Sequence, residues 1–215
     1  MGRLRSGVRE ITEWMDGVRK MSHSMEKELL DAFISLSDKM RCGYKSSLGI
    51  PHREWEQLLT NINRHIPKIY REIYSTFAGT PRDIKEQKLM DFIPGYRLIH
   101  IEELDVEYNT FMRMVGSDAI CENQIEIVIP LLADYASNYI CYVKKQDNTE
   151  AIFGYSTDEG FVGMHKSLEK FFETIIAFYK EDVYFLDDDG FLDYDFEKAG
   201  AIGGRLNPGI EYWTE

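Results

Sequence analysis

The spacing of the apolar residues changes at Pro94, and this change limits the folds that the chain can adopt. Before Pro94, apolar residues recur every three to four positions, as they do on one face of a helix. After Pro94 they alternate with polar residues in several short runs separated by polar turns, which is typical of an antiparallel meander. Helices that precede a meander favour an α+β fold in which the helices pack mainly on one face of an antiparallel or mixed sheet.

The region between Pro94 and residue 180 is expected to contain five strands and two helices. We place strands at residues 96–101, 125–131, 139–144, 151–155 and 161–164, and a helix at residues 102–115. Ser167, a residue type common at helix N-caps, precedes an apolar helix that is predicted to end at Tyr179.

The region before Pro94 is expected to be helical. Residues 8–41 form one helix or two, and further helices are expected at residues 52–66, 68–78 and 81–93. The last of these is suggested by Thr80 as N-cap and Pro81 at the first helical position. Because residues 43–50 have the composition of a linker, we divide the chain into a helical extension (1–47) and an α+β domain (48–215) with an acidic C-terminal segment.

Several short motifs follow one another between residues 51 and 180. Pro67 and Tyr70 begin a helix that is closed by Gly79, and a strand with the acidic turn Glu102-Glu103 comes next. The later motifs are Ile129-Pro130-Leu131-Leu132-Ala133-Asp134, the strand at residues 138–142 and the helix that starts at Ser167-Leu168-Glu169-Lys170-Phe171-Phe172. The order of these motifs resembles that of the SUKH superfamily, which includes yeast regulators of cell-wall glucan synthesis and many bacterial immunity proteins.

The resemblance implies protein binding and no catalysis. Bacterial members of the superfamily commonly bind and neutralise a cognate toxin, so the first expectation is an immunity protein. The alternative is a regulatory or adaptor module of the cell-wall-regulator type that binds an endogenous partner. Neither role implies a cofactor.

The charge of the chain agrees with a protein partner. Asp and Glu number 37 and Lys and Arg 25, so the formal net charge is −12, and all of this excess lies after residue 53. Such a charge repels phosphate backbones and anionic lipids, and it attracts basic proteins. We therefore expect a basic, toxin-like protein as partner, and no nucleic-acid or membrane partner. The alternative is that the acidity serves only to keep the protein soluble. The three scattered cysteines and the absence of an apolar leader favour a cytoplasmic protein, which we expect to be a monomer.

The segment from Glu181 to Glu197 contains eight carboxylates and no Lys or Arg. Aromatic residues lie between them, and aromatic anchors among carboxylates are typical of contact surfaces. The candidate partner-binding residues here are Asp187, Asp188, Asp189, Asp193, Tyr194, Asp195 and Glu197. A solvated acidic face remains an alternative, whereas the spacing does not fit an EF-hand calcium loop. Asp189-Gly190 favours a hairpin turn, with Leu192, Tyr194 and Phe196 expected on one face of the second strand.

Asp134 and Tyr135 complete the candidate site, because they end a strand at a position where the resemblance places a family motif. A turn in which Asp134 caps backbone amides is the simpler interpretation of this pair. The five histidines lack the spacing of a zinc site, and no Ser or Cys lies in a recognisable catalytic motif. The glycines at 200, 203 and 204 are expected to form a flexible turn.

Overall fold

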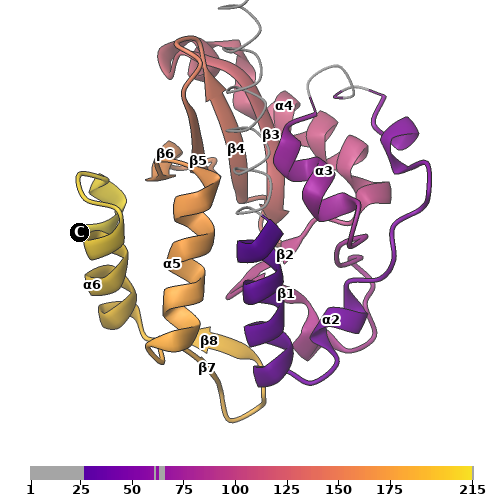
Figure 1. The fold of residues 1–215 in the computed structure, drawn as a ribbon. Coiled ribbons are helices and arrows are strands. Elements are labelled where there is room, and N and C mark those ends of the chain that lie inside the picture. Colours follow the sequence, from indigo (N-terminus) through magenta and orange to yellow (C-terminus); the bar gives the residue numbers. More distant parts are fainter. Residues whose placement is uncertain (1–26, 61, 63–65, 215) are drawn as a thin grey trace, which may run out of the picture.

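A computed structural model describes residues 27–60, 62 and 66–214; the predicted helical segment at residues 8–26 lies outside this part of the chain. The described residues form a six-stranded antiparallel sheet with helices packed on it, and a separate two-stranded hairpin follows (Figure 1). The predicted α+β class is therefore confirmed.

The helices before the sheet are short except for the first. They are a helix over residues 27–40, α2 (Tyr44–Ser47), the 3-10 helix Trp55–Leu58, α3 (Lys68–Tyr74) and the 3-10 helix Gln87–Leu89.

The strands of the sheet are β1 (Asp91–Ile93), β2 (Tyr96–Leu98), β3 (Ile125–Ala133), β4 (Tyr139–Lys145), β5 (Glu150–Ser156) and β6 (Gly160–His165). The remaining elements are α4 (Ile101–Glu122) between β2 and β3, and then α5 (Leu168–Lys180), β7 (Tyr184–Leu186), β8 (Leu192–Tyr194), α6 (Phe196–Leu206) and the 3-10 helix Glu211–Trp213.

The strands of the sheet follow the order of the sequence, as the predicted meander requires. β3, β4 and β5 form its centre. β2 pairs with β3 only at Leu132 and Ala133, so α3 can pack against the other half of β3. There the Tyr70 hydroxyl donates a hydrogen bond of 2.7 Å to the Ile129 carbonyl.

One face of the sheet is covered by α4. The Phe111 ring of α4 lies edge-on against Tyr139 of β4 and Tyr155 of β5, with ring centroids 5.2 and 5.3 Å apart. The predicted helix 102–115 is confirmed, but α4 continues to Glu122 beyond a kink. The kink lies at Gly116, whose φ of 70° and ψ of 164° are not helical.

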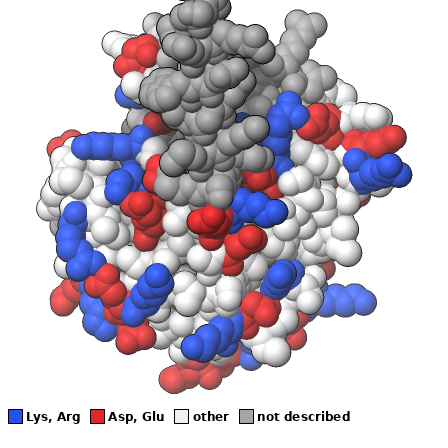
Figure 2. Space-filling view, viewed as in Figure 1, with Lys and Arg blue, Asp and Glu red and all other residues white. Residues whose placement is uncertain are grey.

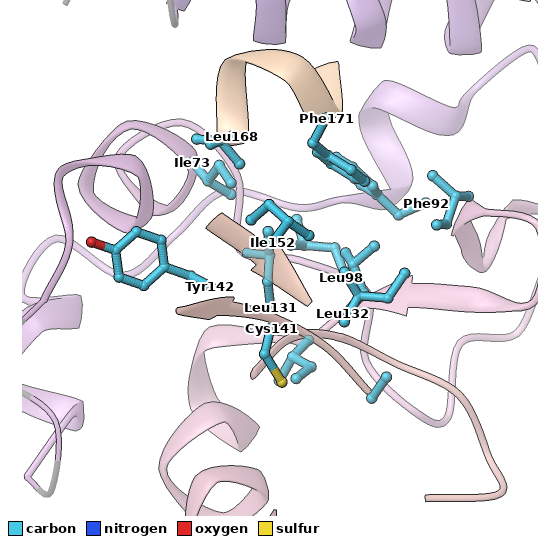
Figure 3. Packing of buried hydrophobic residues seen from close by; sticks show 14 of the residues in the cluster. Ile73, Phe92, Leu98, Leu131, Leu132, Cys141, Tyr142, Ile152, Leu168 and Phe171 are labelled. Carbon is cyan, nitrogen blue, oxygen red and sulfur yellow. The ribbon is translucent and has the colours of Figure 1, made fainter. Parts of the chain in front are cut away.

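The opposite face is covered by α3 and α5. Tyr142 of β4 contacts the Tyr70 ring of α3, and its partner in the register is Ile152 of β5. Figure 3 shows Ile152 beneath Leu168 and Phe171 of α5. Side chains of neighbouring residues in a strand point to opposite faces, so Tyr142 and Tyr139 lie on different sides of β4. The core therefore has two layers, one on each side of the sheet.

The helix over residues 27–40 belongs to the same core. Phe33 is fully buried, and its ring centroid lies 4.5 Å from that of Phe92 in β1 and 6.0 Å from that of Phe172 in α5. Just after this helix, buried Arg41 donates to the Asp91 carbonyl and to the Tyr179 hydroxyl. The segment that the sequence assigned to a helical extension thus shares one hydrophobic cluster with the sheet.

The predicted helix at residues 81–93 is wrong. This segment contains the 3-10 helix Gln87–Leu89 and the short strand β1. Thr80 forms a bridge with Ile99, and the Arg82 side chain is bound by Glu107 of α4. These long-range contacts hold the segment in turns and a short strand, and they outweigh a local helix signal. In the predicted helix at residues 52–66, the described residues contain only the 3-10 helix Trp55–Leu58.

The end of the chain is more ordered than expected. Ser167 caps α5 by accepting a hydrogen bond from the Lys170 amide, which confirms that prediction. The predicted flexible turn at residues 200–204 is wrong, because these glycines lie inside α6. Gly203 is needed there: a Cβ atom at this position would lie 2.1 Å from the Trp213 ring. Phe196 begins α6 and is exposed, so it does not share a strand face with buried Leu192.

Within the residues that the structure describes, no helix is both long and apolar enough to cross a bilayer.

Candidate functional site

A cavity of about 260 Å³ lies between the sheet, α5, the β7–β8 hairpin and the C-terminal turn. Its walls are mostly apolar and aromatic. They include Ile93, Tyr96, Ile140, Glu159, Met164, His165, Phe171, Ile175, Phe178, Tyr184, Tyr194, Tyr212 and Trp213. A cavity of about 150 Å³ with apolar walls is enough to bind benzene in a protein core, so this one has room for a large side chain.

Tyrosine side chains from four elements approach one another at this cavity. Burial, assisted by the nearby charge of Asp134 and the hydroxyls of Tyr212 and Tyr194, raises the pKa of Tyr96 to about 12. Burial also raises the pKa of Tyr184 and of Tyr212, and the Tyr194 hydroxyl adds to both shifts. These hydroxyls therefore stay protonated at neutral pH and can serve as hydrogen-bond donors.

His165 is a buried histidine of the cavity wall, and it is neutral at pH 7. Burial lowers its pKa to about 4, against the opposing effect of a hydrogen bond to Asn207. The Asn207 side-chain NH₂ donates to the Thr174 hydroxyl and to the Gly203 carbonyl, so its Oδ1 atom accepts from His165 Nδ1 at 3.1 Å. This geometry assigns the proton of the imidazole to Nδ1.

A wider groove of about 1010 Å³ adjoins the cavity. It runs between β6 and the N-terminal half of α6 and ends at the C-terminal turn. Its lining residues are Glu159, Phe161, Val162, Gly163, Tyr194, Phe196, Glu197, Ala199, Gly200, Ala201, Glu211, Tyr212, Trp213 and Thr214. Val162, Tyr194, Ala199, Tyr212 and Trp213 line the cavity as well, so the two spaces are continuous.

The groove is negatively charged. Three glutamates line it, and among the described residues no Lys or Arg does. The nearest basic residues of α6 have other partners. Lys198 binds the carboxylate of Asp195, and Arg205 binds that of Glu181. A positively charged ligand would therefore meet uncompensated carboxylates in the groove.

Exposed apolar side chains are concentrated in the same part of the chain. Of ten large hydrophobic residues that are exposed in the described structure, six lie between residues 185 and 212. These six are Phe185, Leu186, Phe191, Tyr194, Phe196 and Tyr212. Phe196 is the most exposed of them, at 73%, and its ring lies 6.5 Å from that of Tyr194, which also lines the groove.

The predicted hairpin is confirmed, with β7 and β8 paired antiparallel. The acidic residues at its turn have different roles. Asp187 shapes the turn, since its carboxylate accepts hydrogen bonds from the Asp189 and Phe191 amides. Asp188 and Asp189 are exposed at the tip. Acidic side chains gather at the lower end of the molecule in Figure 2, where Figure 1 places this hairpin.

The other predicted residues of this segment lie closer to the groove. Tyr194 and Glu197 line it. Asp195 is the N-cap of α6 and accepts from the Lys198 amide, a hydrogen bond that lowers the pKa of the Asp195 carboxyl. Asp193 pairs with Phe185 in the hairpin, and its carboxylate accepts from the Tyr194 amide.

Asp134 and Tyr135 lie in the β3–β4 turn, outside both spaces. Asp134 accepts hydrogen bonds from the backbone amides of Ala136 and Asn138 and from the Asn138 side chain, as a turn-forming aspartate does. Tyr135 is 58% exposed, and its hydroxyl donates to the Arg82 carbonyl. The structure therefore does not join this pair to the hairpin residues in one site.

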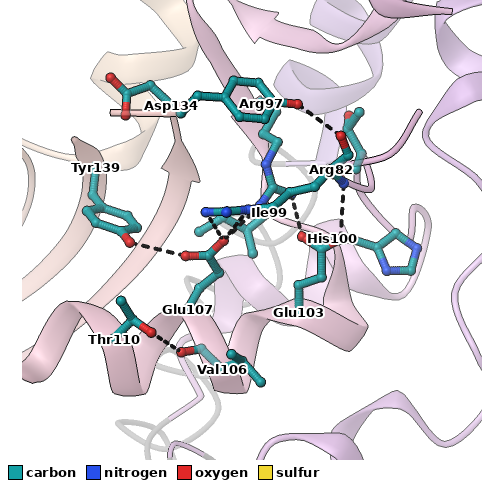
Figure 4. Close-up of polar contacts among 12 residues, drawn as sticks. Arg82, Arg97, Ile99, His100, Glu103, Val106, Glu107, Thr110, Asp134 and Tyr139 are labelled. Carbon is teal, nitrogen blue, oxygen red and sulfur yellow. Dashed lines mark hydrogen bonds and ion pairs between the residues drawn. The ribbon is translucent and has the colours of Figure 1, made fainter. Parts of the chain in front are cut away.

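A second cluster of charged groups lies beneath the β3–β4 turn (Figure 4). The buried guanidinium of Arg97 binds Glu107 at 2.9 Å and Glu103 at 2.7 Å, and Arg82 also binds Glu107. The Tyr139 hydroxyl donates to the remaining oxygen of Glu107. The carboxylate of Glu107 is thus fully engaged, and the cluster ties β2 and the loop after Thr80 to α4. We interpret it as structural.

No group of three or more potential metal ligands occurs among the described residues.

Part of the groove could not be expected from the hairpin alone. Glu159 and Phe161 come from the β5–β6 turn and β6, and Glu211, Tyr212 and Trp213 come from the C-terminal turn. Glu211-Tyr212-Trp213 has the same mixture of acidic and aromatic residues as the predicted segment at residues 181–197. This similarity is the sequence signal that could have indicated the second wall of the groove.

The sequence matches no model of a known protein family and no curated protein. The similarity to the SUKH superfamily therefore stays a prediction from the short motifs.

Proposed function

We propose that this protein is a non-enzymatic binding domain that captures a basic partner protein at the groove between β6 and α6. The best support is that, among the described residues, three glutamates and no Lys or Arg line the groove, together with the exposed rings of Tyr194, Phe196 and Tyr212. Carboxylates accelerate the approach of a basic partner, and aromatic rings hold it after water is displaced.

The partner class that we propose is a toxin that the protein neutralises. The support for it is the resemblance to the SUKH superfamily together with an acidic surface suited to a basic protein. A regulatory adaptor would use the same groove for an endogenous partner, so both roles depend on one binding surface.

The first experiment tests the surface. The full chain is immobilised and incubated with native cell lysate at low and at high salt, beside a variant that combines Glu159→Gln, Glu197→Gln and Glu211→Gln. We expect a basic protein to be retained by the wild type at low salt, and to be lost at high salt or with the variant, because screening and neutralisation both remove the charge attraction.

The matched control neutralises two exposed carboxylates that line neither the groove nor the cavity, Glu86→Gln with Glu122→Gln. It should retain the partner. Equal retention by the groove variant would remove the groove from the interface, and a lysate from which the wild type retains nothing specific would contradict the binding function itself. Growth arrest by the expressed partner, relieved by the wild type and not by the groove variant, would then separate toxin neutralisation from an adaptor role.

A further inference from the structure

β6 is the last strand of the sheet, and one of its edges has no strand partner among the described residues (Figure 1). The C-terminal turn lies beside the Met164 end of this strand, where the Trp213 indole N–H donates to the Met164 carbonyl at 2.7 Å, and no other hydrogen bond joins the turn to β6 among the described residues. The part of β6 that lines the groove is Phe161 to Gly163. Unpaired strand edges are ready to accept an additional strand.

The floor of the groove opens into the cavity beside this edge. Tyr194 and Tyr212 stand at the junction of the two spaces, because they line both. Beyond them the cavity wall is apolar, with Ile140, Phe171 and Phe178. An occupant that enters from the groove therefore meets hydroxyl groups first and a hydrophobic pocket behind them.

The charges that line the groove and the cavity further restrict the kind of ligand that can bind there. Glu159 lines both the groove and the cavity, and Glu197 and Glu211 line the groove. His165, the one titratable nitrogen base in the cavity wall among the described residues, is neutral at pH 7. An occupant with positive charges beside an apolar centre complements this arrangement.

We propose that the partner protein binds by an extended segment that adds to the free edge of β6, places one large apolar side chain in the cavity, and carries Lys or Arg on either side of it. This inference rests on the proposed protein-binding function and specifies its mode. Backbone hydrogen bonds to β6 supply affinity that does not depend on sequence, and the cavity and the three glutamates supply the preference for an apolar residue between basic ones.

Gly200 offers a way to block the groove without disturbing the fold. It lines the groove, its backbone is helical, and a Cβ atom added to it meets nothing within 4 Å. Gly200→Phe would place a ring in the groove and also raise the helix propensity of α6. Val106→Phe is the matched control, because Val106 is 67% exposed on α4 and lies outside the groove.

The probe is a random-peptide phage library selected against the full wild-type chain at low salt. We expect enriched peptides to contain a large apolar residue flanked by Lys or Arg. A synthetic copy of an enriched peptide should bind Gly200→Phe at least about tenfold more weakly than the wild type, and Val106→Phe with unchanged affinity. Methylating backbone amides of that peptide one at a time should weaken binding at alternate positions, as a paired strand requires.

Several results would overturn the proposal. They are a selection that enriches no peptide, enriched peptides without basic residues, binding unaffected by Gly200→Phe, and equal tolerance of methylation at every amide. A dimer of the wild type that Gly200→Phe dissociates would assign the groove to a second copy of the chain instead. If a partner from lysate depends on the three glutamates but binds Gly200→Phe normally, strand addition fails while the protein-binding function stands.

Discussion

His165 is a histidine whose neutral form the fold requires. It is 3% exposed, its ring lies 5.4 Å from those of Phe171 and Trp213, and its hydrogen bond to Asn207 uses Nδ1 as donor. In water the imidazole would be half protonated near pH 6.5, whereas burial lowers its pKa in the folded protein to about 4. Protonation therefore favours the unfolded chain over the folded one.

This difference predicts how stability depends on pH. Because the folded pKa lies below the unfolded one, the contribution of His165 is fully present above pH 6.5 and is lost as the pH falls toward about 4. The loss amounts to about 3 kcal/mol of unfolding free energy at most. Urea unfolding of the wild type and of His165→Gln between these pH values measures it. The variant should show a shallower loss, and parallel pH profiles for the two proteins would contradict the assignment.

At the scale of elements, α4 and α6 each contain a glycine, and the two glycines differ in backbone conformation. Gly116 interrupts α4 with a φ of 70° and a ψ of 164°, a conformation that side-chain-bearing residues rarely adopt. Gly200 has ordinary helical geometry in α6. A Cβ atom would meet nothing within 4 Å at either position, so backbone conformation alone distinguishes them.

The same substitution at these glycines should therefore have effects of opposite sign. We expect Gly116→Ala to lower the unfolding free energy by about 1–3 kcal/mol, because alanine is strained at this φ and ψ. Gly200→Ala should raise it by about 0.5–1 kcal/mol, because alanine is the better helix former. Thermal or denaturant unfolding of the two variants checks both signs. Stabilisation by Gly116→Ala would show that α4 is continuous through this position.

Elements with strong local signals were predictable from the sequence. The strands from Ile125 onward are short apolar runs bounded by polar turns, Ser167 caps α5, and the predicted end of the α4 helix at Val115 coincides with the kink at Gly116. The predictions that were wrong concern segments whose structure depends on contacts with residues far away in the sequence. Residues 81–93 form no α-helix because Arg82 binds α4 and β1 pairs with β2, and the glycines of α6 are helical because Gly203 makes room for the Trp213 ring.

The candidate site was predictable only in part, and the reason lies in the assembly of the whole molecule. Tyr194 and Glu197 belong to the acidic segment that the sequence singles out. The opposite wall comes from β6 and from the C-terminal turn, which lie beside that segment only after the sheet and α6 have formed. A local pattern identifies one wall of such a groove, whereas its partner wall depends on tertiary packing.

The whole molecule also decides where the folding unit begins. The composition of residues 43–50 suggested a linker, yet Tyr44 and Leu48 in this segment are completely buried. The preceding helix inserts Phe33 between β1 and α5, and Arg41 fixes its end to the Asp91 carbonyl. Removing this helix would expose the apolar surfaces of β1 and α5 and would leave the Asp91 carbonyl without its guanidinium donor.

We therefore expect the fragment 48–215 to lose cooperative unfolding. A single substitution in this helix of the full chain should leave unfolding cooperative and lower its free energy by a measurable amount. Phe33→Ala should lower the unfolding free energy by about 3–5 kcal/mol, because it leaves a cavity that the rings of Phe92 and Phe172 cannot fill. Ser35→Ala, on the exposed side of the same helix, should change it by less than about 0.5 kcal/mol. Denaturant unfolding followed by circular dichroism compares the three proteins. A fragment that unfolds in one sharp transition near that of the full chain would contradict this prediction and show that residues 1–47 are a separable extension. The acidic groove could then be studied on the fragment alone.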